Sequence, residues 1–181
     1  MTYNRKGEIL EKAYRTGFEY EKRFKGCSQC AIAAIQDTLD VTDDRVFKAG
    51  TGLAAGGALT SLGSCGGYVG GVMVISQLLG RERSNFEDSE GIRFRTFELA
   101  KKLLDDFLAE FGSILCRDIQ TLKFGRPYYI GDAEEFEKFE EAGGHDDKCT
   151  DVVGKATQMA VRIILDSGLV DLSEVYQKKQ A

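Results

Sequence analysis

The sequence predicts an all-α protein, a single-domain bundle of about seven or eight helices over residues 1–181, with a buried glycine-rich helix at its centre. Three observations support this prediction. The 181 residues include one proline, Pro127, so few positions break a helix. Alternation with the period of a β-strand is sparse. Apolar residues instead recur every three or four positions in several long segments, which is typical of amphipathic helices.

Eight segments are predicted to be helical from this spacing and from their flanking residues. They are 5–24, 28–39, 43–49, 72–79, 90–111, 116–124, 132–141 and 148–167. The segment 72–79 is apolar nearly all round and follows a glycine-rich stretch, so we expect it to be the buried centre. The charged segment 81–89 is the best loop candidate. The buried face of the long helix over 90–111 is predicted to contain Phe94, Phe97, Leu104, Phe107 and Leu108.

Composition and charge argue against two classes of protein. A net charge of −5 and a pI near 5.1 are unfavourable for a nucleic-acid-binding protein, which needs a basic face for phosphates. No run of 18 consecutive apolar residues is present, so we expect no membrane insertion, and the polar N-terminus lacks the apolar region of a signal peptide. We therefore expect a cytoplasmic protein, where cysteines serve metal, catalytic or redox chemistry more often than permanent disulfides.

All five cysteines are predicted to lie at the N-terminal ends of helices. Cys27 and Cys30 flank the start of one helix, and Cys65, Cys116 and Cys149 precede or begin three others. Helix N-termini present unpaired N–H groups and a partial positive charge, which stabilise a thiolate. Both metal ligation and nucleophilic redox chemistry require the thiolate, so the pattern indicates one of these functions.

Glycines are concentrated around Cys65. They are Gly63, Gly66, Gly67, Gly70 and Gly71. A glycine costs about 1 kcal/mol relative to alanine inside a helix, so a cluster of them indicates close approach of another group. A neighbouring helix, a metal cluster and a cofactor are the alternatives.

The stretch Cys65-Gly-Gly-Tyr-Val-Gly70 resembles the Cys-Gly-Ala-x-x-Gly motif of the "C-GCAxxG-C-C" redox-active protein family, small bacterial and archaeal proteins with four characteristic cysteines. The resemblance extends over about 26–165, which we take as a four-cysteine redox core. Gly67 stands where the family has alanine, and Cys27 is an additional thiol. The resemblance places the four family cysteines at Cys30, Cys65, Cys116 and Cys149, and the motif glycines, as candidate cofactor-binding positions, at Gly66 and Gly70.

Family members often accompany transporter genes and resemble the iron–sulfur portion of split-Soret cytochromes. The resemblance therefore implies the fold and the four cysteines more directly than it implies a reaction. It also implies a link to a membrane transport system. Electron transfer, which we expect from the chemistry of the cysteines, would require a redox partner protein of unknown identity.

Several chemistries fit the residues. An iron–sulfur cluster would be ligated by four thiolates at Cys30, Cys65, Cys116 and Cys149, and this is the function we expect. Alternatives are a metal-free catalytic dithiol of Cys27 and Cys30, a structural zinc site, and a non-redox binding protein in which the cysteines only pack.

Enzymatic activity is left open, because no acid–base pair stands out in the sequence. The sole histidine, His145, lies in an acidic glycine-containing stretch. We expect it to be a solvated loop residue, with metal ligation or proton donation near Cys149 as the alternative.

Overall fold

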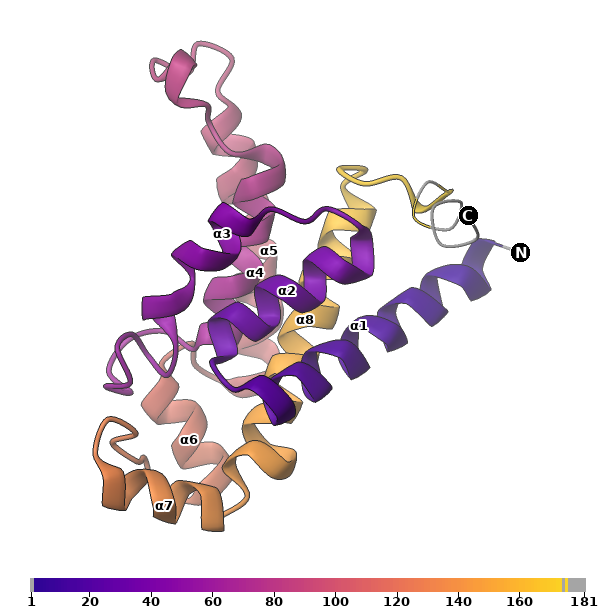
Figure 1. Ribbon diagram of the computed structural model, residues 1–181. Helices are drawn as coiled ribbons and strands as arrows, with labels where there is room; N and C mark the ends of the chain where they lie inside the picture. The colour runs from indigo at the N-terminus through magenta and orange to yellow at the C-terminus, as the bar shows by residue number, and fades with distance from the viewer. Residues whose placement is uncertain (1, 174, 176–181) are drawn as a thin grey trace.

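The computed structural model describes residues 2–173 and 175, and these residues form eight α-helices and no named strand (Figure 1). The helices are α1 (Thr2–Phe24), α2 (Cys27–Leu39), α3 (Asp44–Ala49), α4 (Gly66–Leu79), α5 (Ile92–Phe111), α6 (Cys116–Phe124), α7 (Ala133–Glu141) and α8 (Cys149–Asp166). Two 3₁₀ turns, η1 (Thr51–Leu53) and η2 (Arg83–Asn85), and a π-helical turn, η3 (Gly144–Lys148), complete the described elements. The all-α prediction is confirmed.

The main core joins α1, α2, α4, α5 and α8. It contains Ile9, Ala13, Ile32, Ile35, Leu39, Val74, Ile75, Leu99, Leu103, Ala160, Val161, Ile163 and Ile164, with Val175 from the last described segment. Helix α1 lies along α8 (Figure 1). Glycines allow this close approach, since a Cβ on Gly17 would overlap the Thr157 side chain and one on Gly154 would lie 2.9 Å from the Tyr14 ring.

Helix α4 is the buried glycine-rich helix that the sequence predicts, but it begins six residues earlier than expected. The glycines form its first two turns, and Gly66, Gly67, Gly70 and Gly71 are buried. A Cβ on Gly70 would lie 2.7 Å from the Ser28 carbonyl oxygen, and one on Gly71 would lie 2.7 Å from Leu103 Cδ2. Close packing against α2 and α5 therefore offsets the low helix propensity of these glycines.

The predicted buried face of α5 is largely wrong. Phe107 is buried as expected, but Phe94 and Phe97 are 58% and 60% exposed. The buried positions are Thr96, Leu99, Leu103, Phe107 and Phe111. The reason is that the start of α5 projects with the end of α4 and the 80–91 loop beyond the rest of the molecule (Figure 1). None of the described helices has the length and apolarity needed to cross a bilayer.

Candidate functional site: a cavity lined by four thiols

Four cysteine side chains line one cavity of about 380 Å³, which we call the thiol cavity. Cys27, Cys116 and Cys149 are the first residues of α2, α6 and α8, and Cys65 is the N-cap of α4. The predicted position of these cysteines at helix N-termini is confirmed. Each of the four helices therefore places the positive end of its dipole near its cysteine. In α6 and α8 the first N–H groups already have acceptors, since the Cys116 and Arg117 N–H groups donate to the Gly63 and Ser61 carbonyls and the Cys149 N–H donates to the Gly144 carbonyl.

Backbone hydrogen bonds fix the spacing of Cys65 and Cys116. The Cys65 N–H donates to the Ile114 carbonyl at 2.7 Å, and the Cys116 N–H donates to the Gly63 carbonyl at 2.9 Å. These bonds surround an isolated antiparallel bridge between Ser64 and Leu115. The starts of α4 and α6 are thus tied together, although they are distant in sequence.

Cys30 lies outside the thiol cavity. Its thiol donates to the Lys25 carbonyl at 3.2 Å, and its side chain borders a different groove, with Tyr20 and Phe47. Residues three apart in a helix point only about 60° away from each other, so this spacing alone does not separate Cys30 from Cys27. The two thiols differ in their partners, which are the Lys25 carbonyl for Cys30 and the Ala55 N–H for Cys27. The structure therefore groups Cys27 with Cys65, Cys116 and Cys149, whereas Cys30 was predicted in its place. All five cysteines are free thiols.

Three of the cavity sulfurs have N–H donors close to them. The Ala55 N–H donates to Cys27 Sγ at 3.3 Å, and Gln120 Nε2 donates to Cys116 Sγ at 3.5 Å. The backbone N–H groups of Gly67 and Tyr68 act on Cys65 and oppose the rise in its pKa. N–H donors of this kind stabilise negative charge on sulfur. Cys30 differs, because its sulfur is used as a donor.

Burial dominates the protonation of these thiols. It raises the pKa of Cys65 to about 12 and raises the pKa values of Cys27, Cys116 and Cys149 as well. The charge of Glu21 adds to the rise in the pKa of Cys27 and Cys149. In the absence of a cation the thiols are therefore neutral at pH 7, and coordination to a metal would be needed to hold them as thiolates.

A network of charged side chains closes the cavity at the end of α1. Glu21 is 2% exposed, and its Oε1 lies 3.5 Å from His145 Nε2. His145 Nδ1 lies 2.6 Å from Glu140 Oε1, which also accepts a hydrogen bond from Lys25 Nζ at 2.7 Å. The side chain of His145 is 11% exposed, so the expectation of a solvated loop histidine is wrong. The π-helical turn and the ring of Phe139, 5.2 Å away between centroids, hold it in place.

Glu21 also lines the cavity, and it was not predicted from the sequence. The sequence does contain a signal for it. The buried residues of α1 recur every four positions, and Glu21 is the last of the series Ile9, Ala13, Gly17 and Glu21. A charged residue on such a stripe is unusual, because charged side chains are rarely buried without a partner.

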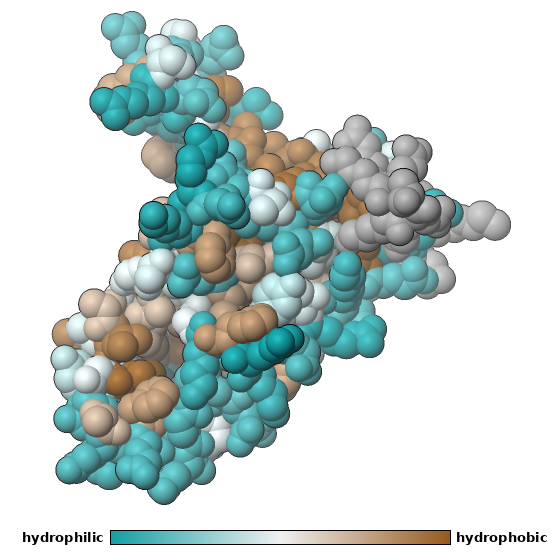
Figure 2. Space-filling model, viewed as in Figure 1, coloured by the Kyte–Doolittle hydropathy of each residue, from teal (hydrophilic) through white to brown (hydrophobic). Residues whose placement is uncertain are grey.

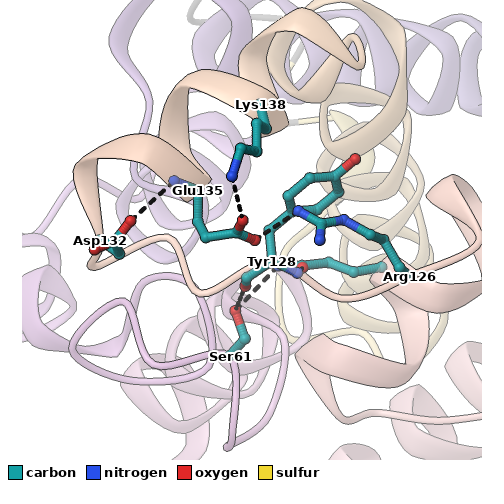
Figure 3. Close-up of polar contacts among 7 residues, drawn as sticks. Ser61, Arg126, Tyr128, Asp132, Glu135 and Lys138 are labelled. Carbon is teal, nitrogen blue, oxygen red and sulfur yellow. Dashed lines mark hydrogen bonds and ion pairs between the residues drawn. The ribbon is translucent and has the colours of Figure 1, made fainter.

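Another part of the cavity wall, next to this network, is formed by the 126–132 loop and α7, and polar contacts fix the loop (Figure 3). Ser61 Oγ donates to the Tyr128 carbonyl at 2.8 Å, and the Tyr128 N–H donates to Gln120 Oε1 at 2.6 Å. Asp132 caps α7 by accepting from the Glu135 N–H at 3.0 Å, and Arg126 binds Glu135 at 2.6 Å. The backbone that borders the cavity is thus anchored to α6 and to the segment before α4.

Apolar side chains cover much of this side. They come from the loop before α4, the 130–133 loop and α7, and include Leu59, Ile130, Phe136 and Phe139. Figure 2 shows hydrophobic side chains gathered around a hollow in this part of the surface. A mostly apolar cavity with a few polar groups is typical of ligand and cofactor sites.

The candidate cofactor-binding glycines lie at the contact between α2 and α4 and are not among the residues that line the cavity. Gly70 faces the backbone of α2, as described above. A Cβ on Gly66 would overlap Cys27 Sγ and lie 2.7 Å from the Ser28 backbone nitrogen. Gly66 therefore leaves space for the Cys27 sulfur.

Gly66→Ala is expected to destabilise the protein by about 1–3 kcal/mol, because a side chain's rotation does not relieve overlap with a backbone nitrogen. The gain of about 1 kcal/mol in helix propensity offsets only part of this. The free energy of unfolding, measured in urea for the variant and the wild type, gives this loss of stability. Gly52→Ala is the matched control, since a Cβ there meets nothing within 4 Å. Equal stability of the two variants would contradict the placement of Cys27 against Gly66.

Stability is expected to fall as pH rises above about 6.5. Burial acts to lower the pKa of His145, but its hydrogen bonds to Glu21 and Glu140 and their charges outweigh burial and leave the pKa raised. A raised pKa in the folded state stabilises the protein below the unfolded value of about 6.5, and this contribution is lost as pH rises through the folded pKa. Unfolding free energies between pH 6 and 8 test this, and His145→Gln should flatten the profile. If the dependence of the unfolding free energy on pH is the same in His145→Gln as in the wild type, the charged contacts of His145 with Glu21 and Glu140 do not contribute to stability.

The fold and the site together define a helical protein with four thiols around one buried cavity, a class suited to thiol or metal redox chemistry. The family model described as "Putative redox-active protein (C_GCAxxG_C_C)" matches residues 26–163. The chain belongs to this family, as the resemblance in the sequence predicted. Neither the curated proteins nor the solved structures give a significant match.

Proposed function

We propose that this redox-active protein transfers electrons through an iron–sulfur cluster held by Cys27, Cys65, Cys116 and Cys149. The observation that supports it most is the convergence of four thiols, from four helix N-termini, on one cavity. Four cysteine thiolates are the usual ligands of such clusters. The proposal replaces Cys30 by Cys27 in the ligand set that the sequence suggested.

The residues fit such a group in their donor chemistry and in the space that they enclose. Among the described residues, no three His, Cys, Asp or Glu side chains are arranged to hold a metal ion as they stand. The proposal therefore rests on the shared cavity and on the N–H donors near the sulfurs. A bound cluster would supply one-electron chemistry.

The chain's own residues would favour the charged form of the site in three ways. The helix N-termini place positive dipole ends beside the thiolates. The N–H groups of Ala55, Gly67 and Tyr68 and the Gln120 amide stabilise charge on sulfur. The apolar side chains of α7 and its preceding loop limit access of water, and burial of this kind tunes a reduction potential.

The metal-free dithiol of Cys27 and Cys30 has less support. The two thiols face different surroundings, and burial raises the pKa of both. Exchange is fastest for a thiol whose pKa lies near the ambient pH. Electron transfer also requires a partner, for which a cytoplasmic redox protein is our expectation. The link to a membrane transport system stays a prediction.

Anaerobic purification of the full chain, followed by a visible spectrum and by iron, sulfide and zinc analysis, tests the proposal. We expect brown protein with stoichiometric iron and sulfide. Colourless, metal-free protein that loses two thiols on mild oxidation would favour the dithiol. One zinc per chain would favour the structural site, and five inert thiols without metal would favour packing alone.

A further inference from the structure

Helix α5 exposes a row of apolar side chains, which we call the α5 row. Successive residues are about 100° apart around a helix, so the row lies on the side away from the buried Leu99, Leu103 and Phe107. It contains the exposed Phe94, Phe97 and Leu108 and the half-buried Leu104. Helices α4 and α8 pack against the buried side of α5. The start of the row lies where α5 projects beyond the rest of the molecule (Figure 1).

The spacing of the α5 row is that of a helix paired with another helix. Its positions alternate between steps of three and four residues, which is the a and d spacing of a coiled-coil seam. They are Phe94, Phe97, Lys101, Leu104 and Leu108. This periodicity predicts a buried face, yet the single chain leaves the face in water. Exposed apolar surface of this kind marks interaction sites, so a helix of a second molecule would complete the packing.

The charges next to the row favour a second copy of the same helix in the antiparallel direction. In a parallel two-fold pair each residue meets its own copy, so Lys101 would face Lys101. In an antiparallel pair a positions pack against d positions, so Lys101 meets an apolar residue of the other copy. The exposed Glu98 and Asp105 lie beside such positions, so the ammonium group gains an opposite charge in place of a like one.

The charge of α5 also changes sign along its length. Residues 92–102 contain four basic and one acidic side chain, a net charge of +3, and residues 103–111 contain three acidic side chains, a net charge of −3. Ion pairs with Asp88, Lys155 and Arg162 offset some of these charges but leave both signs unchanged. An antiparallel pair aligns opposite charges and opposite ends of the helix dipoles.

We propose that the protein forms a two-fold symmetric dimer in which the α5 rows of two copies pack antiparallel. None of the residues that line the thiol cavity comes from α5. The pairing is therefore independent of what the cavity holds and goes beyond the proposed function. Because the row is short, we expect association in the micromolar range.

Sedimentation velocity of the full chain over a concentration series tests the dimer. It is run with a reductant, so that chains joined by disulfides do not count. The mass should rise from 20.0 kDa towards twice that value. Phe94→Ser/Phe97→Ser should weaken association at least ten-fold, since aromatic side chains dominate interface energies. Phe24→Ser is the matched control, because Phe24 is 59% exposed on another helix, and it should associate as the wild type does.

The direction of the helices is tested by salt. Raising its concentration from about 0.1 M to about 1 M shortens the Debye length from about 10 Å to about 3 Å. Association of the wild type should then weaken, whereas that of Lys101→Glu, which places like charges together, should strengthen. A monomer at every concentration, or equal association of Phe94→Ser/Phe97→Ser and the wild type, would overturn the dimer. The same direction of response to salt in the wild type and Lys101→Glu would overturn the antiparallel arrangement.

Discussion

Cys27→Ser is expected to lose the bound iron of the wild-type protein, whereas Cys30→Ser keeps it. The reason is the placement of the two thiols. Cys27 lines the thiol cavity with Cys65, Cys116 and Cys149, and its sulfur accepts the Ala55 N–H. Cys30 borders another groove. Loss of an outer-shell partner alone costs 10- to 100-fold in metal affinity, so loss of a ligand should cost at least that much.

The measurement is iron per chain after identical anaerobic purification of both variants. Cys30→Ser is the matched control, because a serine hydroxyl still donates to the Lys25 carbonyl and the position lies one helical turn from Cys27. Its stability should fall by about 1 kcal/mol, the usual effect of a single substitution. Iron retained in Cys27→Ser and lost in Cys30→Ser would restore the ligand set suggested by the sequence.

Phe139→Ala is expected to destabilise the protein by about 3–5 kcal/mol, the usual cost of truncating a buried phenylalanine. Phe139 is 1% exposed, and its ring lies 5.3 Å from Phe124, 5.8 Å from Tyr128 and 5.2 Å from His145 between centroids. It joins α7 to α6 and to the π-helical turn, so its loss leaves a void beside the thiol cavity. A total stability of 5–15 kcal/mol is typical, so this change is large.

Urea unfolding of Phe139→Ala beside Tyr129→Ala measures this effect. Tyr129 lies in the same region of the chain but is 54% exposed, and surface substitutions usually change stability by no more than about 0.5 kcal/mol. A similar small loss in both variants would show that α7 does not depend on this packing.

The helices were predictable because their local signals agree with their packing. In α1 the apolar spacing marks the buried side, and in α8 a similar pattern places Val152, Val153 and Ala156 in the interior. The predicted starts of α2, α6 and α8 differ from the observed ones by no more than one residue. The glycine-rich start of α4 was placed too late, because glycine signals a loop unless a neighbouring helix packs against it.

The composition of the site was only partly predictable. Residues of α2 are buried on nearly every side, including Ser28, Cys30, Ala31 and Ile32, so periodicity does not show which cysteine faces the cavity. The family match covers both Cys27 and Cys30 and does not decide between them. Phe94 and Phe97 were misplaced because their exposure depends on how far α5 extends beyond its neighbours, which is a property of the assembled fold.

Mass spectrometry of the intact, anaerobically purified chain under native conditions tests the central claim most directly. The folded chain is expected to show an added mass equal to four irons and four sulfides, lost together when the protein is denatured in acid. That mass should be absent from Cys27→Ser and present in Cys30→Ser. A wild-type mass equal to the bare chain, to the chain less two hydrogens, or to the chain with a single zinc would contradict the claim that the four cavity thiols hold an iron–sulfur cluster.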